Sequence, residues 1–437
     1  MTSGTRGEDS GSVPVLYMAM ELSASKWLLG FGAGDGRKCR RRTVDAGSLA
    51  ALEVEIRAAK EKFGLAPEAT VVSCYEAGRD GFWIHRALIA AGVQNHIVES
   101  ASILVDRRER RAKTDAIDVE ALLRMLVRFH RGETEVWRTV RVPSEGDEDR
   151  RRLHRERERL KKEMTSLRNR ILGLLATQGA KADPDTLDEY LKTARSCDGR
   201  EFGAAFRNEL SRMHARVVVL RGQLAEIDQE QMSQLRSPNR SSTAQKVAQL
   251  MCLCGIGLQG AWPLVMEFFE WREFRNRREV GALAGLTGTP FNSGKGDRDQ
   301  GISKAGNKRI RRLLVELAWL WLRHQPNSAL SLWFARKWGA GAKRGRKCGI
   351  VALARKLLIA LWHFVEHGVI PEGARLMASP GVKKATVDSV SKRHEEVQAA
   401  RAASVIAVSR VRHDARSSTR IEGVEASVAP TARLALA

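Results

Sequence analysis

The chain contains 437 residues, of which 43% are hydrophobic, and this composition is typical of a globular protein with two or three domains. Its 74 Lys and Arg residues outnumber 51 Asp and Glu residues, so the formal net charge is +23 and a polyanionic partner is expected. The sequence has no run of about 18 apolar residues and no amphipathic terminal helix with a basic face, so nucleic acid is favoured over a membrane.

Cysteine usage and the N-terminal residues both favour a reducing cytoplasm. Among the six scattered cysteines only Cys252 and Cys254 are close together. A C-x-C pair without a second pair or a nearby His is poor zinc spacing, so free thiols are expected. Residues 1–13 are polar and lack the apolar stretch of a signal peptide, and we interpret them as a flexible N-terminus.

Residues 14–145 alternate between strand and helix patterns. Strands are expected at 14–22, 26–32, 39–46, 69–78 and 95–100, and helices at 47–64, 82–92 and 115–131. Three strands in a meander, followed by helix, strand, helix, strand and helix, is the element order of the ribonuclease-H-like fold. The sequence therefore predicts an α/β domain of this class, with ligands at the C-terminal ends of its strands.

Four carboxylates fall where this topology would bring them together. Glu21 and Glu76 end two of the strands, and Asp115 and Asp118 begin the last helix. Four carboxylates at one edge need a cation, and oxygen ligands without His or Cys suit Mg²⁺ or Mn²⁺. Simpler alternatives exist for each: Asp115 as an N-cap with Asp118 favoured by the helix dipole, Glu76 as a loop residue, and Glu21 paired with Lys26.

Residues 146–240 carry two segments with heptad spacing, joined by a polar connector. The second segment places Phe206, Leu210, Met213, Val217, Leu220, Leu224 and Ile227 at alternating intervals of four and three residues. This spacing predicts an antiparallel pair of helices with an apolar seam. The pair is either a helical hairpin within one core or a coiled-coil arm that joins two copies, and the highly charged surface favours the arm.

Residues 241–378 predict a mostly helical domain. The segment AQLMCLCGIGLQGAWPLVMEF has the pattern of a helix-hairpin-helix, in which glycines let the backbone approach a phosphate. A loop is expected at 287–301. Residues 304–356 hold fourteen Lys and Arg residues against one acid, Glu316, as in a nucleic-acid-binding face. From 379 to 437 the chain is rich in Ala, Ser, Arg and Val without periodicity, and a disordered tail is expected.

Several of these segments resemble one family. The stretch KTDAIDVEALLRML is similar to the K-T-D-x-x-D-A signature of the DEDD transposases of insertion sequence family 110, which are bridge-RNA-guided recombinases. The blocks SCYEAGRDGFWIHRALIAAG and LAGLTGTPFNSGKGDRDQGISKAGNKRIRRLLVELAW resemble two further family blocks. The first acid departs from the family pattern, because the chain has AMELSASK where the family has G-I-D-x-S-K.

The resemblance implies a resolvase-like nuclease domain, a coiled-coil arm and a C-terminal domain with a nucleophilic serine. The four acids fall on Glu21, Glu76, Asp115 and Asp118, and the serine falls on Ser293. A serine hydroxyl that attacks phosphorus keeps the bond energy in a covalent phosphoserine link, ready for rejoining.

Two alternatives stay open for the serine: Ser293 as a simple turn residue, and Ser303 as the nucleophile. The residues expected to contact nucleic acid are Arg110, Arg111, Lys113, Lys295, Arg298, Lys304, Asn307, Lys308, Arg311 and Arg312.

The expected function is therefore that of a DNA recombinase in the cytoplasm, associated with the bacterial nucleoid. The expected partners are double-stranded DNA, a structured guide RNA implied by the resemblance, and further copies of the chain in a dimer or tetramer. Because the acids and the serine lie in different domains, they must meet by folding back or across copies. Two rivals remain: a junction endonuclease that uses water, and an inactive nucleic-acid-binding remnant suggested by Glu21 in place of Asp.

Overall fold

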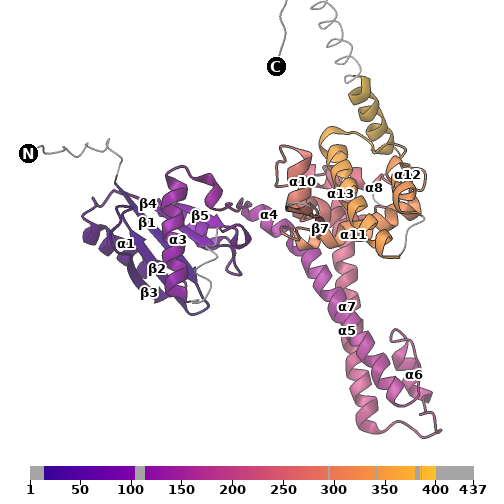
Figure 1. The fold of residues 1–437 in the computed structure, drawn as a ribbon. Helices are drawn as coiled ribbons and strands as arrows, with labels where there is room; N and C mark the ends of the chain where they lie inside the picture. Colours follow the sequence, from indigo (N-terminus) through magenta and orange to yellow (C-terminus); the bar gives the residue numbers. More distant parts are fainter. Residues whose placement is uncertain are drawn as a thin grey trace, which may run out of the picture. The chain divides into compact units, whose positions relative to one another are not determined.

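The computed structural model describes residues 14–103, 114–293, 296–339, 343–378, 384 and 386–399. The chain divides into two compact units, Met1–Ser144 and Glu145–Ala437, beside the domain boundary expected at residue 145 (Figure 1). The described part of the first unit is a mixed α/β domain, and that of the second is largely helical. The predicted class, α/β plus α, is confirmed at this level.

The first unit is built on a five-stranded sheet in the order β3-β2-β1-β4-β5. Its strands are β1 (Val15–Leu22), β2 (Lys26–Gly32), β3 (Arg40–Asp45), β4 (Thr70–Glu76) and β5 (Gln94–Val98). β1, β4 and β5 are parallel, whereas β2 pairs antiparallel with both β1 and β3. The central strand β1 is a continuous apolar run because helices cover both of its faces.

Helices cover the two faces of this sheet. They are α1 (Leu49–Phe63), α2 (Trp83–Ala90) and α3 (Asp115–His130), with the short 3-10 helices η1 (Ser100–Ser102) and η2 (Thr134–Val136). Alternate residues of β1 face opposite layers: Met18 and Met20 pack with α1 and α2, whereas Ala19 packs with α3. The five strands and three helices predicted for residues 14–145 are all present.

The second unit begins with a long pair of helices. Its first elements are α4 (Glu145–Arg150), α5 (Arg152–Thr177), α6 (Leu187–Thr193) and α7 (Ala204–Arg236). α5 and α7 lie side by side and run antiparallel (Figure 1). Arg157 near the start of α5 pairs with Asp228 near the end of α7 at 2.6 Å, and Arg170 pairs with Glu209 near the start of α7 at 3.0 Å.

The heptad residues of α5 and α7 share one core. Leu210 and Val217 of α7 are fully buried in the same cluster as Ile171 and Leu175 of α5. The predicted seam is therefore used within one chain, as in the helical-hairpin alternative. A contact between copies through this arm stays a prediction.

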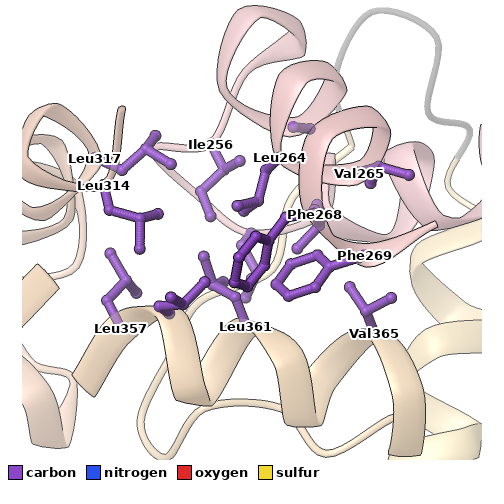
Figure 2. Packing of buried hydrophobic residues seen from close by; sticks show 14 of the residues in the cluster. Ile256, Leu264, Val265, Phe268, Phe269, Leu314, Leu317, Leu357, Leu361 and Val365 are labelled. Carbon is purple, nitrogen blue, oxygen red and sulfur yellow. The ribbon is translucent and has the colours of Figure 1, made fainter. Parts of the chain in front are cut away.

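The remaining elements of the second unit form a helical domain around a separate apolar core. They are α8 (Ser242–Met251), α9 (Leu258–Leu264), η3 (Val265–Phe269), α10 (Arg277–Leu283), β6 (Gly288–Ser293), β7 (Gly296–Ile302), α11 (Lys308–His324), α12 (Ala329–Trp338) and α13 (Lys343–His367). Figure 2 shows Phe268 and Phe269 of η3 against Leu361 and Val365 of α13, with Leu314 of α11 near Leu357 of α13.

The predicted helix–G-I-G–helix segment connects α8 to α9. Gly255 has a φ of +90°, a backbone conformation that favours glycine, and Gly257 is the N-cap of α9. A Cβ atom at Gly255 would lie 2.9 Å from the Cβ of His324 on α11. The glycine thus lets this turn pack closely against α11.

The loop predicted at 287–301 is wrong for most of its length. β6 and β7 pair as an antiparallel hairpin, with Ser293 at the end of β6 opposite Gly296. The segment is dense in Gly, Asn, Ser and Asp, which indicated a loop. The ladder is formed by backbone N–H and C=O groups, which Gly, Asn, Ser and Asp also provide, so this composition is compatible with a hairpin.

The prediction of a disordered tail from residue 379 is wrong for residues 386–399, which are helical. Val387 and Val390 pack against the core of the helical domain. The backbone N–H of Ile370 donates a hydrogen bond to Nδ1 of His394 at 2.9 Å. The few apolar residues of this segment are buried only by contact with the core of the helical domain. The pattern of residues within the segment does not predict that contact.

Among the described residues, one helical segment, Gly345–His367 in α13, is long and apolar enough to cross a membrane. Leu353, Leu357 and Leu361 of this segment are fully buried in the core of the helical domain. The apolar character of α13 is therefore accounted for by its place in that core.

Candidate active-site edge and nucleic-acid interface

The two glutamates lie at neighbouring strand ends. β1 and β4 are parallel with Met20 opposite Tyr75, so the next residues, Glu21 and Glu76, lie side by side at the C-terminal edge of the sheet. Both are half-buried. We call the sheet edge that carries these two glutamates and the start of α3 the carboxylate edge.

Both glutamates occupy positions on the side of the sheet that α3 covers. Ala19 and Cys74, two residues before them, pack in the cluster that contains α3, and side chains two apart on a strand share a face. Burial raises the pKa of the Cys74 thiol, and the nearby carboxylate of Glu76 raises it further, as expected for neighbours on one face. All six cysteines lie in the described part of the chain and are free thiols, as predicted.

α3 runs against the direction of β1, which places its first turn over the carboxylate edge. At the start of β1, the Tyr17 hydroxyl lies 2.9 Å from Nδ1 of His130, the last residue of α3. Further along, a Cβ atom at Gly30, which pairs with Ala19, would lie 3.3 Å from Val119 in the second turn of α3. The first turn, with its two aspartates, therefore lies over the strand ends.

The two aspartates are not the caps of this helix. Thr114 is the N-cap, and its hydroxyl accepts a hydrogen bond from the N–H of Ile117 at 3.3 Å. The alternative in which Asp115 caps the helix is therefore wrong. Asp115 is exposed and Asp118 is half-buried.

Glu21 and Glu76 end neighbouring strands and Asp115 and Asp118 begin α3, but the four carboxylates do not form a closed metal site. Among the described residues, no group of three or more His, Cys, Asp or Glu side chains is arranged to hold a metal ion. Lys26, the alternative partner of Glu21, pairs with Asp45 at 2.6 Å. The donor set is made of carboxylate oxygens, which fits Mg²⁺ or Mn²⁺ and not a metal that prefers sulfur or imidazole.

The expected nucleophile and several basic residues are described only in part. Arg110, Arg111, Lys113 and Lys295 lie outside the described residues. Ser293 lies at the end of β6 and Arg298 lies within β7. The hairpin thus positions the backbone of Ser293 next to a tight connection between two strands.

The turn before α11 is packed against the end of α10. The N–H of Lys304 donates to the Gly285 carbonyl at 3.2 Å, and the N–H of Asn307 donates to the Leu283 carbonyl at 2.8 Å. Gly285 has a φ of +67°, and a Cβ atom there would overlap the carbonyl oxygen of Ala305. This close approach requires glycine and holds Lys304, itself at a φ of +56°, in one backbone position.

Two of the expected phosphate contacts have structural roles instead. The side-chain oxygen of Asn307 caps α11 by accepting from the N–H groups of Arg309 and Ile310 at 3.0 and 3.2 Å. The Arg311 guanidinium donates to the carbonyls of Ala284 and Ala305. Both side chains stabilise the turn, and sequence reasoning did not assign them this role.

Arg312 is also paired within the chain. Its guanidinium donates to Glu158 of α5 at 2.6 Å, and Arg309 pairs with the same carboxylate. Lys304 and Lys308 are exposed at the start of α11. Arg312 is exposed as well, but it is paired with Glu158, whereas Lys304 and Lys308 form no ion pair within the described part of the chain.

A buried carboxylate, which the sequence reading missed, joins α5 to the helical domain. Glu267 of η3 has a side chain that is 2% exposed, and it accepts hydrogen bonds from Arg155 at 2.6 and 2.9 Å. His154 Nε2 lies 2.9 Å from the same carboxylate. Burial alone would raise the pKa of Glu267, but the hydrogen bonds from His154 and Arg155 outweigh it and lower the pKa to about 2.

Comparisons with known proteins give the class. The sequence profile described as "Transposase IS116/IS110/IS902 family" matches residues 234–332. "Putative transposase y4rJ" of Sinorhizobium fredii is 42% identical over 383 residues, which cover 84% of this chain and 95% of that protein. The transposase for insertion sequence element IS1328 of Yersinia enterocolitica is 27% identical over 50% of this chain and 63% of its own length. The transposase for insertion sequence element IS1111A of Coxiella burnetii is 23% identical over 64% of this chain and 73% of its own length.

A basic chain with carboxylates at a sheet edge is typical of enzymes that act on nucleic acid, and its similar proteins are transposases. The chain belongs to the IS116/IS110/IS902 family of transposases. Its partner is therefore DNA, and its activity is that of a transposase, the cleavage and transfer of DNA.

Proposed function

We propose that this transposase cuts and rejoins DNA through a covalent phosphoserine intermediate at Ser293, with Mg²⁺ or Mn²⁺ held by the carboxylate edge. The observation that carries the proposal is that Glu21 and Glu76 end neighbouring parallel strands on the face covered by α3, and that the first turn of α3 holds Asp115 and Asp118. The sheet order, with parallel β1, β4 and β5 beside antiparallel β2 and β3, supports a ribonuclease-H-like domain in the finer classification.

The bound cation would supply positive charge at the phosphate that is cut. Glu21 and Glu76 at the strand ends and Asp115 and Asp118 at the helix start are the residues that would hold it. Glu21 has a longer side chain than the Asp of the family pattern, so its carboxylate reaches further from the same backbone position.

The proposed chemical step is a transesterification. The Ser293 oxygen forms a bond to phosphorus while the bond from phosphorus to the deoxyribose oxygen breaks. The serine proton passes to solvent or to a carboxylate, and the departing oxygen takes up a proton. Because one phosphoester replaces another, the link can be attacked by a second DNA strand without an outside energy source.

Charge supports a further nucleic-acid partner. The net charge of +23 favours binding of a large number of phosphates. A structured guide RNA that pairs with donor and target DNA would supply further phosphates to this basic chain. We propose that Arg110, Arg111, Lys113, Lys295, Arg298, Lys304 and Lys308 contact nucleic-acid backbones. We also propose that a dimer or tetramer forms through the outer faces of α5 and α7, since their shared seam is buried within the chain.

Trapping of a covalent protein–DNA adduct tests the proposed chemistry. Wild-type protein with Mg²⁺, RNA from the flanking DNA and a DNA substrate should form an adduct that survives denaturation. Ser293→Ala should form none, whereas Ser303→Ala should form it as wild type does. Cleavage by Ser293→Ala would identify a water-using endonuclease instead, and no cleavage by any protein would identify a binding-only remnant.

A further inference from the structure

An exposed tryptophan lies at the same edge of the sheet as the carboxylates. Trp83 is the first residue of α2 and follows β4 after a short loop, so it lies at the C-terminal edge where Glu76 ends that strand. Its relative exposure is 42%. Within the described part of the first unit, it is the only exposed aromatic among the large hydrophobic side chains.

A buried partner holds this tryptophan in place. The ring centroid of Trp83 lies 5.8 Å from that of Trp27, with the planes tilted by 40°. Trp27 is 2% exposed and pairs in the sheet with Leu22, the residue that follows Glu21. Trp83 is therefore anchored beside the end of β1 on the face that α1 and α2 cover, at the same end of the sheet as Glu21 and Glu76, which belong to the α3 face.

An exposed guanidinium lies in the loop between the glutamate and the tryptophan. The Arg79 side chain is 66% exposed, and its nearest carboxylate, that of Asp80, is 3.9 Å away. An exposed aromatic ring and an exposed guanidinium at the same end of the sheet as the carboxylates match the base and the phosphate of a nucleic-acid strand beside its scissile bond.

We infer that Trp83 stacks on an unpaired or unstacked base of the DNA beside the strand that is cut, and that Arg79 holds the adjoining phosphate. This inference rests on the proposed function, because it takes the carboxylate edge as the site of cleavage. The chemical class of the ligand is a nucleobase in DNA. A purely structural Trp83 would only cover Trp27, and any large apolar side chain would do that as well.

Binding of a DNA duplex with a short unpaired bulge separates stacking from packing. Trp83→Leu keeps an apolar side chain over Trp27 but removes the aromatic face, and it should weaken binding of the bulged duplex about tenfold. Trp83→Phe should stay within about threefold of wild type because it keeps a ring. Ile89→Ala is the matched control, since Ile89 is 50% exposed on the same helix away from the edge.

Two further readouts locate the contact. A bulge that carries 5-iodouracil should photocrosslink to the peptide that contains Trp83, and the same base in a single-stranded RNA should crosslink there much less. Arg79→Gln should reduce the slope of the logarithm of the DNA-binding constant against the logarithm of the salt concentration by about one, as expected for the loss of one phosphate contact. Thermal unfolding of each variant is compared with that of wild type, and the photocrosslink in wild-type protein carries the test if Trp83→Leu is destabilised.

The outcomes distinguish this inference from the proposed function. Bulge binding by Trp83→Leu equal to that of wild type, or crosslinks that map elsewhere, would overturn the stacking role even if the Ser293 adduct forms. A crosslink that favours RNA over DNA would overturn the assignment to DNA. Weaker bulge binding by Trp83→Leu, with binding by Trp83→Phe close to that of wild type, would support the stacking role of Trp83 even if no covalent adduct is found. In that case only the proposed phosphoserine chemistry would fail.

Discussion

Asp118→Asn should slow DNA cleavage by about a hundred- to a thousandfold while leaving DNA affinity nearly unchanged. The substitution removes one charge from the carboxylate edge and keeps the shape of the side chain. Helix α3 should remain intact, because Thr114 and not Asp118 caps it. Single-turnover cleavage in Mg²⁺ and gel-shift binding in its absence measure the two effects separately.

Glu120→Gln is the control on the same helix. The Glu120 carboxylate lies 3.5 Å from Arg41 on β3, away from the strand ends that carry Glu21 and Glu76. Its loss should change the cleavage rate by less than about threefold, because an ion pair at the surface contributes little to the stability of the domain and the fold around the carboxylate edge is kept. Equal losses in Glu120→Gln and Asp118→Asn would mean that α3 responds to charge in general and that the carboxylate edge is not the cleavage site.

Glu267→Ala should lower the free energy of unfolding of the second unit by about 3–5 kcal/mol. The substitution leaves the buried His154 and the partly buried Arg155 without their shared carboxylate. Urea denaturation followed by tryptophan fluorescence reports on this region, because the Trp271 indole N–H donates to the Glu267 carbonyl. The exposed Glu316 on α11 gives the control, since Glu316→Ala should change stability by less than about 0.5 kcal/mol.

The same carboxylate predicts how stability depends on pH. The folded-state pKa of Glu267 is about 2, below its ordinary value of 4.5. A lowered pKa means that the unfolded chain binds the proton more tightly, so the contribution is present above about pH 4.5 and is lost as the pH falls towards 2. The loss amounts to about 3 kcal/mol in wild type and should be absent in Glu267→Gln. Identical acid titrations of the two proteins would contradict this assignment.

Local patterns were sufficient for the first unit. Its strands are short apolar runs and its helices have apolar residues at helical spacing, so each element could be predicted without knowledge of its neighbours. The meeting of Glu21 with Glu76 then followed from topology, because parallel strands in the centre of a sheet end at one edge. The cap at Thr114 was missed because an Asp in the next position is also a favoured helix start.

Patterns failed where long-range contacts decide the structure. Glu267 lies in an apolar segment, and its partners His154 and Arg155 are more than a hundred residues away in sequence. The helix at 386–399 has too few apolar residues to predict its packing, and it is buried only against a core formed by other elements. Arg311 and Arg312 were assigned to phosphates from charge alone, although carbonyls and Glu158 compete for them in the folded chain.

The formation of joined DNA strands tests the central claim most directly. Purified protein, donor DNA, target DNA, RNA from the flanking region and Mg²⁺ should yield sequenced donor–target junctions without ATP, because the phosphoserine link conserves the bond energy. Ser293→Ala should yield none, and Asp118→Asn should yield them about a hundred- to a thousandfold more slowly than wild type. Cut ends that are never joined, or junctions that still form in Ser293→Ala, would contradict the account.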